Sequence, residues 1–144
     1  MDLKELLNKQ IIAKVNPDRN QSFELIKLAG ENLVAAEDNL KMKHFDWGLA
    51  IAYNAMLSAA RGLMALKGYR AFAEQHHLAV VQFCAAVMPT ESTILVVTFN
   101  RYRVRRHNVV YGQRESVGED EVKNAIDSAK KFVEKIKELA EKNK

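Results

Sequence analysis

An arginine-rich segment, RYRVRRHNVVY from Arg101 to Tyr111, has the residue types and the spacing best suited to chemistry in this chain. Five arginines fall within fourteen residues, at positions 101, 103, 105, 106 and 114, and His107 lies among them. No acidic residue occurs between Ile94 and Arg114. A helix that needs only to be soluble usually mixes charges of both signs. Clustered guanidinium groups beside side chains that titrate or hydrogen-bond predict an anion site, for which phosphate is the commonest ligand.

Arg106 is an exception on the apolar face of this predicted helix. At about 100° per residue, one stripe contains Leu95, Phe99, Tyr102, Arg106, Val109 and Val110. A buried guanidinium must be paired or must face a polar cavity. Two alternatives therefore stay open. Arg106 either pairs with an acid on a neighbouring helix, with Glu37, Asp38 and Asp46 as candidates, or it serves an anion site.

The opposite side of the same helix is also partly apolar. It contains Val97, Asn100, Val104, His107 and Tyr111. Two partly apolar faces need two neighbours: one is the core, and the other is a second subunit or a substrate groove. Arg103, His107 and Tyr111 follow one another at intervals of one helical turn, so they share a surface. A neighbouring arginine would disfavour the imidazolium form of His107 and leave a neutral base.

The remaining candidates for chemistry are weaker. His76 and His77 lack cysteine or carboxylate ligands at helical spacing, so we interpret them as surface or core histidines and expect no metal site. Cys84, the single cysteine, excludes an intramolecular disulfide and is interpreted as a small buried side chain. The lysines of the C-terminal helix alternate with glutamates, which is typical of a solvated face. We expect no cofactor.

The chain is expected to fold as a single all-α domain over residues 1–144, an antiparallel, up-down bundle of five to six helices. Scarcity of Pro (2) and Gly (6) favours long helices. Apolar periodicity and turn residues predict a short N-terminal helix over 2–15, a core over 20–140, and core helices near 20–43, 47–66, 71–87, 91–112 and 119–143. The helix near 47–66 is apolar on nearly every face, so it is expected at the centre of the bundle. The β-branched run ILVVTF is assigned to helix because the sequence offers no partner strand.

Composition limits the function classes. The chain has 144 residues, 48% hydrophobic and 28% charged, which is globular rather than disordered. A net charge of +4 permits a nucleic-acid partner without requiring one. The N-terminal MDLKELLNKQ has charges where a signal peptide would be apolar, and no apolar run has the length of a membrane span. We therefore expect a soluble, cytoplasmic protein without a membrane partner.

With these features in place, the chain resembles the HEPN domain family, small helical proteins of prokaryotic toxin and RNA-processing systems. One stretch that carries the resemblance is IAYNAMLSAARGLMALKGYRA followed by HHLAVVQF, an Ala-rich helix, a Gly-Tyr turn and a histidine that opens the next helix. The other is RYRVRRHNVVYG followed by EDEVKNAIDSAKKFVEKI. Together they cover about Asp46 to Glu138.

The resemblance implies a homodimer and site residues. HEPN ribonucleases carry an arginine, usually followed by a polar residue, and a histidine further on, and two copies form one RNA-cleaving cleft. In the best register Arg106 takes the arginine position, His107 the polar one, and Tyr111 the place of the histidine. This departure argues against ribonuclease activity, because a tyrosine with a pKa near 10 is a poor base. A second register pairs Arg101 with His107. Gln113 stands where the toxin branch has a tyrosine, so modification there by a transferase is not expected.

Two functions from different classes follow. The first is a dimeric RNA-binding protein, with metal-independent cleavage as its catalytic form, in which Arg106, His107 and Tyr111 act at the scissile phosphate. The phosphate contacts predicted beside them are Arg101, Arg103, Arg105 and Asn108. The alternative is a non-catalytic HEPN module that pairs with a nucleotidyltransferase-like protein.

Overall fold

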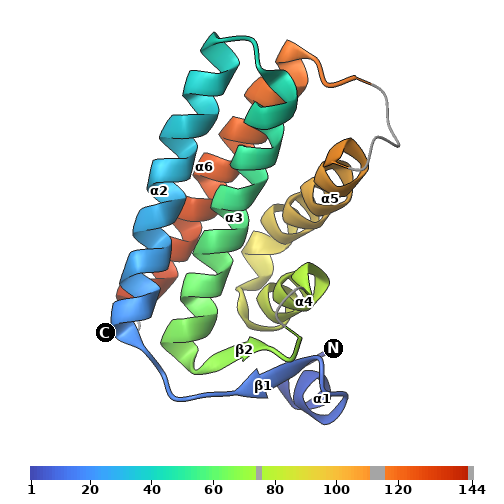
Figure 1. Cartoon of the computed structure of the whole chain (residues 1–144). Helices are drawn as coiled ribbons and strands as arrows, with labels where there is room; N and C mark the ends of the chain where they lie inside the picture. The colour runs from blue at the N-terminus through green and yellow to red at the C-terminus, as the bar shows by residue number, and fades with distance from the viewer. Residues whose placement is uncertain (74–75, 111–115, 143–144) are drawn as a thin grey trace.

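The computed structural model describes residues 1–73, 76–110 and 116–142, and within them six α-helices dominate the fold (Figure 1). The helices are α1 (Leu3–Asn8), α2 (Arg19–Lys41), α3 (Phe45–Lys67), α4 (His77–Val87), α5 (Thr93–Val110) and α6 (Glu119–Lys142). A short 3-10 helix, η1 (Thr90–Ser92), leads into α5, and the strands are β1 (Ile12–Lys14) and β2 (Tyr69–Ala71). The predicted all-α bundle is confirmed, and ILVVTF is helical as expected.

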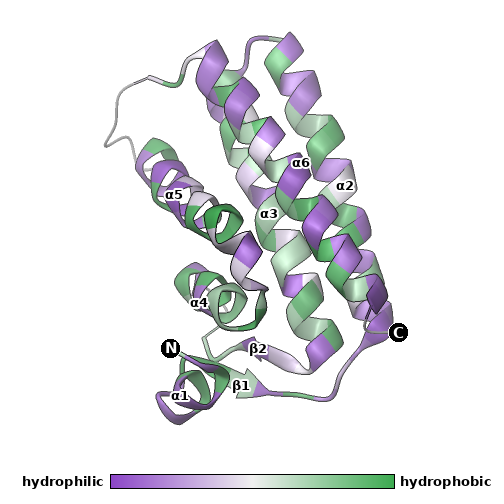
Figure 2. Cartoon of the chain, turned by 180° about the vertical axis from the view of Figure 1, so that it is seen from behind, coloured by the Kyte–Doolittle hydropathy of each residue, from purple (hydrophilic) through white to green (hydrophobic). Residues whose placement is uncertain are grey.

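The long helices α2, α3 and α6 form the body of the bundle, with α4 and α5 packed beside α3 (Figure 1). Consecutive long helices alternate in direction: α2 and α5 run one way, α3 and α6 the other. Figure 2 shows hydrophilic and hydrophobic residues alternating along α2 and α6, as expected of helices with one buried face. Glycines allow close approach to α3. A Cβ added at Gly62 would lie 2.8 Å from Ile26 Cγ1 on α2, and one at Gly48 would lie 2.9 Å from Val122 Cγ1 on α6.

Helix α3 is the central helix, as its apolar sequence predicts. Most of its residues are buried, from Gly48 near its start to Leu66 near its end. By length and composition α3 could cross a membrane, but 78% of its most apolar stretch is buried inside the fold. This burial explains the composition of α3, because a helix surrounded by other helices must be apolar on every side.

A row of aromatic rings fixes α5 against the bundle. The Phe99 ring on α5 lies 4.8 Å from that of Phe132 on α6 and 5.9 Å from that of Tyr53 on α3, measured between centroids. All three side chains are fully buried. Tilted aromatic pairs at such distances add to the free energy of burial. The row therefore sets the rotation of α5 and decides which of its arginines turn inward.

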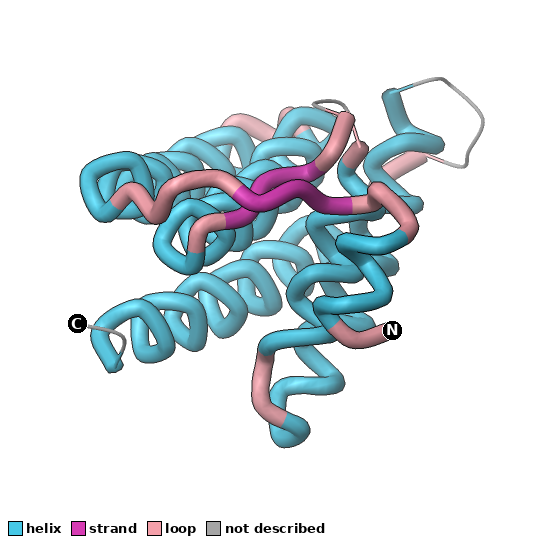
Figure 3. Tube along the Cα trace, turned by 90° about the horizontal axis from the view of Figure 1, so that it is seen from below, coloured by secondary structure: helices cyan, strands magenta, loops and turns pink. Residues whose placement is uncertain are grey.

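The two strands correct the predicted N-terminal and fourth helices. The expected helix over 2–15 ends at Asn8, and Ile12–Lys14 instead pairs antiparallel with Tyr69–Ala71. The expected fourth helix begins at His77 rather than at residue 71, because the segment before it contains β2. Viewed from below, the small sheet lies across the end of the helices (Figure 3).

Helix ends follow local capping rules with one exception. Gly68 ends α3 with a left-handed φ of 85°, as predicted, and an added Cβ there would lie 2.8 Å from Val15 O. The Asp18 carboxylate caps α2 by accepting a hydrogen bond from Gln21 N at 2.9 Å. Helix α3 is the exception: His44 takes its N-cap position and makes no side-chain capping bond, while Asp46 lies in the first turn.

Candidate anion-binding site

Helix α5 has a buried side and an exposed side, as its sequence predicts, but Val110, which was predicted on the apolar stripe, is 50% exposed. Phe99, Tyr102 and Val109 are buried against the rest of the fold. On the other side, the side chains of Val97 and Val104 are 59% and 44% exposed. The arginines of α5 lie at different positions around the helix, so each guanidinium has a different environment.

Arg106 lies half-buried on the inner side of α5. Its Nε is buried and has no hydrogen-bond partner among the described residues, and no ion pair to Arg106 occurs within them. Within the described residues, the structure therefore does not show the alternative in which Arg106 pairs with an acid. Glu37, one proposed partner, forms an ion pair with Lys130 of α6 instead. A buried donor without an acceptor costs about 1–3 kcal/mol, so this arginine requires an explanation.

Arg103 lies one turn before Arg106 and is also half-buried. Its Nε donates a hydrogen bond to Asn100 Oδ1 at 2.9 Å, which holds the guanidinium along the helix. Both arginines act electrostatically on two groups that belong to other helices, Tyr53 of α3 and His77 of α4. The inward side of α5 therefore brings its positive charge to the junction of three helices.

Tyr53 and His77 form a hydrogen-bonded pair at this junction, with Tyr53 Oη 3.1 Å from His77 Nδ1. Burial raises the pKa of Tyr53 to about 12, although Arg103, Arg106 and Arg61 act in the opposite direction. Burial is also the main cause that lowers the pKa of His77 below its usual 6.5, and the same three arginines add to this effect. At neutral pH the pair is thus a phenol and a neutral imidazole.

The acid–base properties of Tyr53 and His77 indicate which atom of the pair carries each proton. The unprotonated nitrogen of a neutral imidazole is a good acceptor, so we assign the Tyr53 hydroxyl as donor to His77 Nδ1. The other nitrogen, Nε2, then carries a hydrogen that can be donated to an acceptor such as a phosphate oxygen. Three arginines and one N–H donor around a neutral pair can bind an anion, and none of these groups is a base strong enough to compete for a proton.

Three residues of this junction were not predicted from the sequence: Tyr53, Arg61 and His77. One signal was available: Arg61 is the only charged residue between Asp46 and Lys67 in a helix that is otherwise apolar. Tyr53 precedes it by two helical turns and lies on a similar face. His77 was interpreted as a surface or core histidine, and nothing local to HHLAVVQF distinguishes it from His76, which is exposed.

The other residues predicted for the site are dispersed. Arg105 makes a bidentate ion pair with Glu121 of α6, with Nε–Oε2 2.6 Å and Nη2–Oε1 2.9 Å. Arg101 is exposed, and its guanidinium lies 5.6 Å from the centre of the Tyr102 ring. His107 is exposed and Asn108 is half-buried. Tyr111 lies outside the described residues. The structure thus brings together Arg103 and Arg106, and it directs Arg101 and Arg105 elsewhere.

The sequence matches the model of a known protein family. The model of the HEPN domain matches residues 23–139, from the first turns of α2 almost to the end of α6. The chain belongs to the HEPN domain family. No curated protein shows significant similarity to its sequence. HEPN domains are known from RNA-related and toxin–antitoxin proteins.

The HEPN match includes all the helices that build the Tyr53–His77 junction and omits α1 and β1. In this HEPN domain Arg106, the residue assigned to the family arginine, is the arginine with the buried unpaired Nε. The assignment of Tyr111 to the family's histidine position stays a prediction. Within the described residues, no group of three or more His, Cys, Asp and Glu side chains could hold a metal ion.

Proposed function

We propose that this HEPN domain binds RNA as a homodimer, with Arg103 and Arg106 as the phosphate contacts at the centre of its binding surface. The observation that carries the proposal is the half-buried Arg106, whose Nε lacks a partner in the described chain, beside Arg103 and the Tyr53–His77 pair. A guanidinium in such a place is stabilised when an anion supplies the missing negative charge.

Charge distribution favours a phosphate backbone as that anion. The stretch from Ile94 to Arg114 has arginines and no acid, so positive potential persists along α5. A chain of phosphates can contact several arginines along one helix, whereas a single small anion can contact few of them. The RNA association known for HEPN domains points in the same direction.

The exposed apolar side of α5 supports the homodimer. Ile94, Val97 and Val104 are 78%, 59% and 44% exposed and follow one another on one side of the helix. HEPN domains often dimerise, and a second copy of this face would remove these side chains from water. Arg101 lies in the same stripe, so pairing would bring together arginines of both copies. A bound phosphate chain would offset their repulsion.

Fluorescence anisotropy with a labelled single-stranded RNA tests the proposal. Arg103→Ala with Arg106→Ala should weaken binding at least about tenfold, because two charge-assisted contacts are lost. The matched control is Arg19→Ala with Lys41→Ala, which removes two cations from α2, a helix on the other side of α3 from α5 (Figure 1). Equal affinity of both double variants would refute the proposed surface.

The same protein tests whether bound RNA is cut. The metal-independent reaction would join the ribose 2′-oxygen to the neighbouring phosphorus, pass the hydroxyl proton to His107, and release the 5′-oxygen, which takes a proton from solvent. Products would be a 2′,3′-cyclic phosphate and a 5′-hydroxyl. Incubation of labelled RNA in EDTA, with Arg106→Ala and His107→Ala beside wild type, decides the matter. Cleavage by wild type alone supports catalysis, and intact RNA in all samples limits the function to binding.

The proposal also includes the cellular location of the protein and a possible protein partner. We place the protein in the cytoplasm of a prokaryote, within a toxin–antitoxin or RNA-processing system, because that is where such HEPN domains would meet RNA. Pairing with a nucleotidyltransferase-like protein remains the alternative predicted from sequence. Affinity purification of the tagged protein from its own host, followed by mass spectrometry, tests for that partner.

A further inference from the structure

Trp47 is a large aromatic side chain that the fold leaves in water. It lies in the first turn of α3, is 67% exposed, and is the single tryptophan of the chain. Tryptophan is on average a well-buried residue, and it is enriched among the side chains that contribute most to binding at protein surfaces. Its exposure here is therefore not explained by the packing of the bundle.

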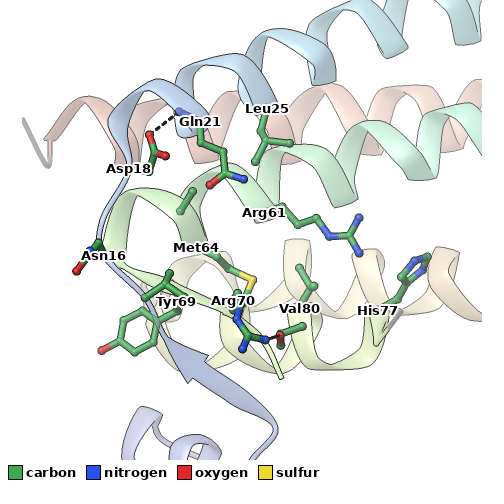
Figure 4. A pocket seen from close by; sticks show the side chains of 13 residues that line it. Asn16, Asp18, Gln21, Leu25, Arg61, Met64, Tyr69, Arg70, His77 and Val80 are labelled. Atoms are coloured by element: carbon green, nitrogen blue, oxygen red, sulfur yellow. Dashed lines mark hydrogen bonds between the residues drawn. The ribbon is translucent and has the colours of Figure 1, made fainter. Parts of the chain in front are cut away.

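Trp47 begins the open stripe of α3. Trp47, Asn54 and Arg61 follow one another at intervals of seven residues, or about two helical turns, so they lie on one side of the helix. This side leads to the Tyr53–His77 junction, where Figure 4 shows the Arg61 guanidinium beside the His77 ring. Within α3, which the structure describes in full, the residues between 48 and 66 that are not buried all belong to this stripe or adjoin it: Ala50, Ile51, Asn54 and Arg61.

Trp47 and Arg106 lie at about the same level of the bundle. Helices α3 and α5 run in opposite directions, and their Tyr53 and Phe99 rings are 5.9 Å apart (Figure 1). Trp47 lies six residues before Tyr53, which is about 9 Å along α3. Arg106 lies seven residues after Phe99, which is about 10.5 Å along α5 toward the same end of the bundle. A strand that contacts Arg106 therefore passes the level of Trp47.

Arg103 points to the same side of the bundle as the open stripe. Helix α6 lies behind α2 and α3 in Figure 1, and Arg105 points toward α6 because it pairs with Glu121. Two residues correspond to about 200° around a helix, so Arg103 points away from α6. The open stripe of α3 is also turned away from α6, which packs against the buried side of α3.

We propose that Trp47 stacks against a base of the RNA strand whose phosphates Arg103 and Arg106 contact, an inference that rests on the RNA binding proposed above. Asp46 adjoins Trp47 and would repel a phosphate, so a neutral base suits this position better than the backbone does. The indole ring has a flat face on which any base can stack. Proteins that bind single strands commonly combine such rings with cationic side chains that contact the backbone.

The intrinsic fluorescence of the protein tests this contact directly. Because Trp47 is the single tryptophan, its emission reports on this position alone. Unlabelled single-stranded RNA should quench the emission, with the same midpoint as in the anisotropy titration. Inorganic polyphosphate, which has the charge of RNA but no bases, should bind without comparable quenching. Unchanged emission with RNA that binds by anisotropy, or equal quenching by polyphosphate, would overturn the proposal.

Substitution of Trp47 tests how much the stacked base contributes. Trp47→Ala should weaken RNA binding about 5- to 150-fold, the usual effect of losing one stacked base. Trp47→Phe, which keeps a flat ring, should restore most of the affinity, whereas Trp47→Leu, which is apolar but not flat, should not. Phe23→Ala is the matched control, because Phe23 is 65% exposed near the start of α2, at the other end of the bundle, and should bind as wild type does (Figure 1).

The salt dependence of binding separates stacking from phosphate contact. Trp47→Ala should lower the affinity at every salt concentration and keep the wild-type slope, because no phosphate contact is lost. Equal affinities of Trp47→Ala and Phe23→Ala would overturn the stacking and leave the α5 phosphate contacts in place, whereas wild type that binds no RNA would overturn both proposals. Altered sedimentation of Trp47→Ala with unchanged RNA affinity would assign Trp47 to a protein contact instead. Circular dichroism ensures that the variants are folded.

Discussion

His77 is a residue whose surroundings change its ordinary chemistry. A histidine on a helix surface would titrate near 6.5, but this one is half-buried, is hydrogen-bonded to Tyr53, and lies near Arg61, Arg103 and Arg106. Burial, and to a smaller extent the three arginines, disfavour the imidazolium. The site thus has a neutral hydrogen-bond donor at His77, where a charged histidine would repel the nearby arginines.

The lowered pKa of His77 predicts a pH dependence of stability. Above pH 6.5 the imidazole is neutral in both folded and unfolded chains, so the stabilising contribution is complete. As the pH falls below 6.5 the unfolded chain takes up a proton more readily than the folded one, and stability is lost until the lower folded pKa is passed. Urea unfolding at pH 7.5 and 5.5, conditions chosen on either side of about 6.5, should show a larger loss for wild type than for His77→Gln.

The other histidines are unchanged in that variant, so their contributions cancel in the comparison. Gln replaces the imidazole with a group that does not titrate and can still accept from Tyr53. If wild type and His77→Gln lost the same free energy of unfolding between the two pH values, His77 would not have a lowered pKa in the folded state.

At the scale of elements, the close approach of α2 and α3 holds Arg61 and Tyr53 at the junction. Gly62→Ala would place a Cβ 2.8 Å from Ile26 Cγ1 and 3.2 Å from the Ser22 carbonyl oxygen. Such overpacking costs about 1–3 kcal/mol, and the better helix propensity of alanine offsets about 1 kcal/mol. We expect a net loss of up to about 2 kcal/mol in the free energy of unfolding, measured with urea.

Gly30→Ala is the matched control on α2. Nothing lies within 4 Å of a Cβ added there, so only the propensity gain of about 0.5–1 kcal/mol remains. Stability should therefore rise in Gly30→Ala and fall in Gly62→Ala. Shifts of the same sign in both variants would mean that α2 and α3 do not approach at Gly62 as described.

Elements whose signals are local were predictable from sequence. The burial of α3 follows from its apolar faces, its end from Gly68, and the two sides of α5 from the spacing of Phe99 and Val97. The strands were not predictable, because three residues of β1 have no periodicity of their own and gain their partners from residues 69–71. The Tyr53–His77 pair likewise depends on the packing of α3 against α4, which no local pattern specifies.

At the scale of the whole molecule, the exposed apolar side of α5 is proposed to join two copies. Val97→Glu places a charge in that contact, and because Val97 is 59% exposed the fold itself should tolerate it. Sedimentation velocity should then show a monomer, whereas wild type is expected to sediment as a dimer. Phe23→Glu changes a side chain that is 65% exposed on α2 and should leave the dimer intact. A dimer that persists in Val97→Glu would place the contact elsewhere.

RNA binding is proposed to depend on Arg103 and Arg106 as phosphate contacts, and the salt dependence of that binding tests this most directly. The logarithm of the association constant should fall linearly with the logarithm of salt concentration, by about 0.7 for each phosphate contact to a single strand. Arg103→Ala with Arg106→Ala should reduce the magnitude of that slope by about 1.4, twice the value for one contact. The Arg19→Ala, Lys41→Ala control should keep the wild-type slope. A slope that the α5 variant leaves unchanged would contradict the proposal that Arg103 and Arg106 contact phosphates.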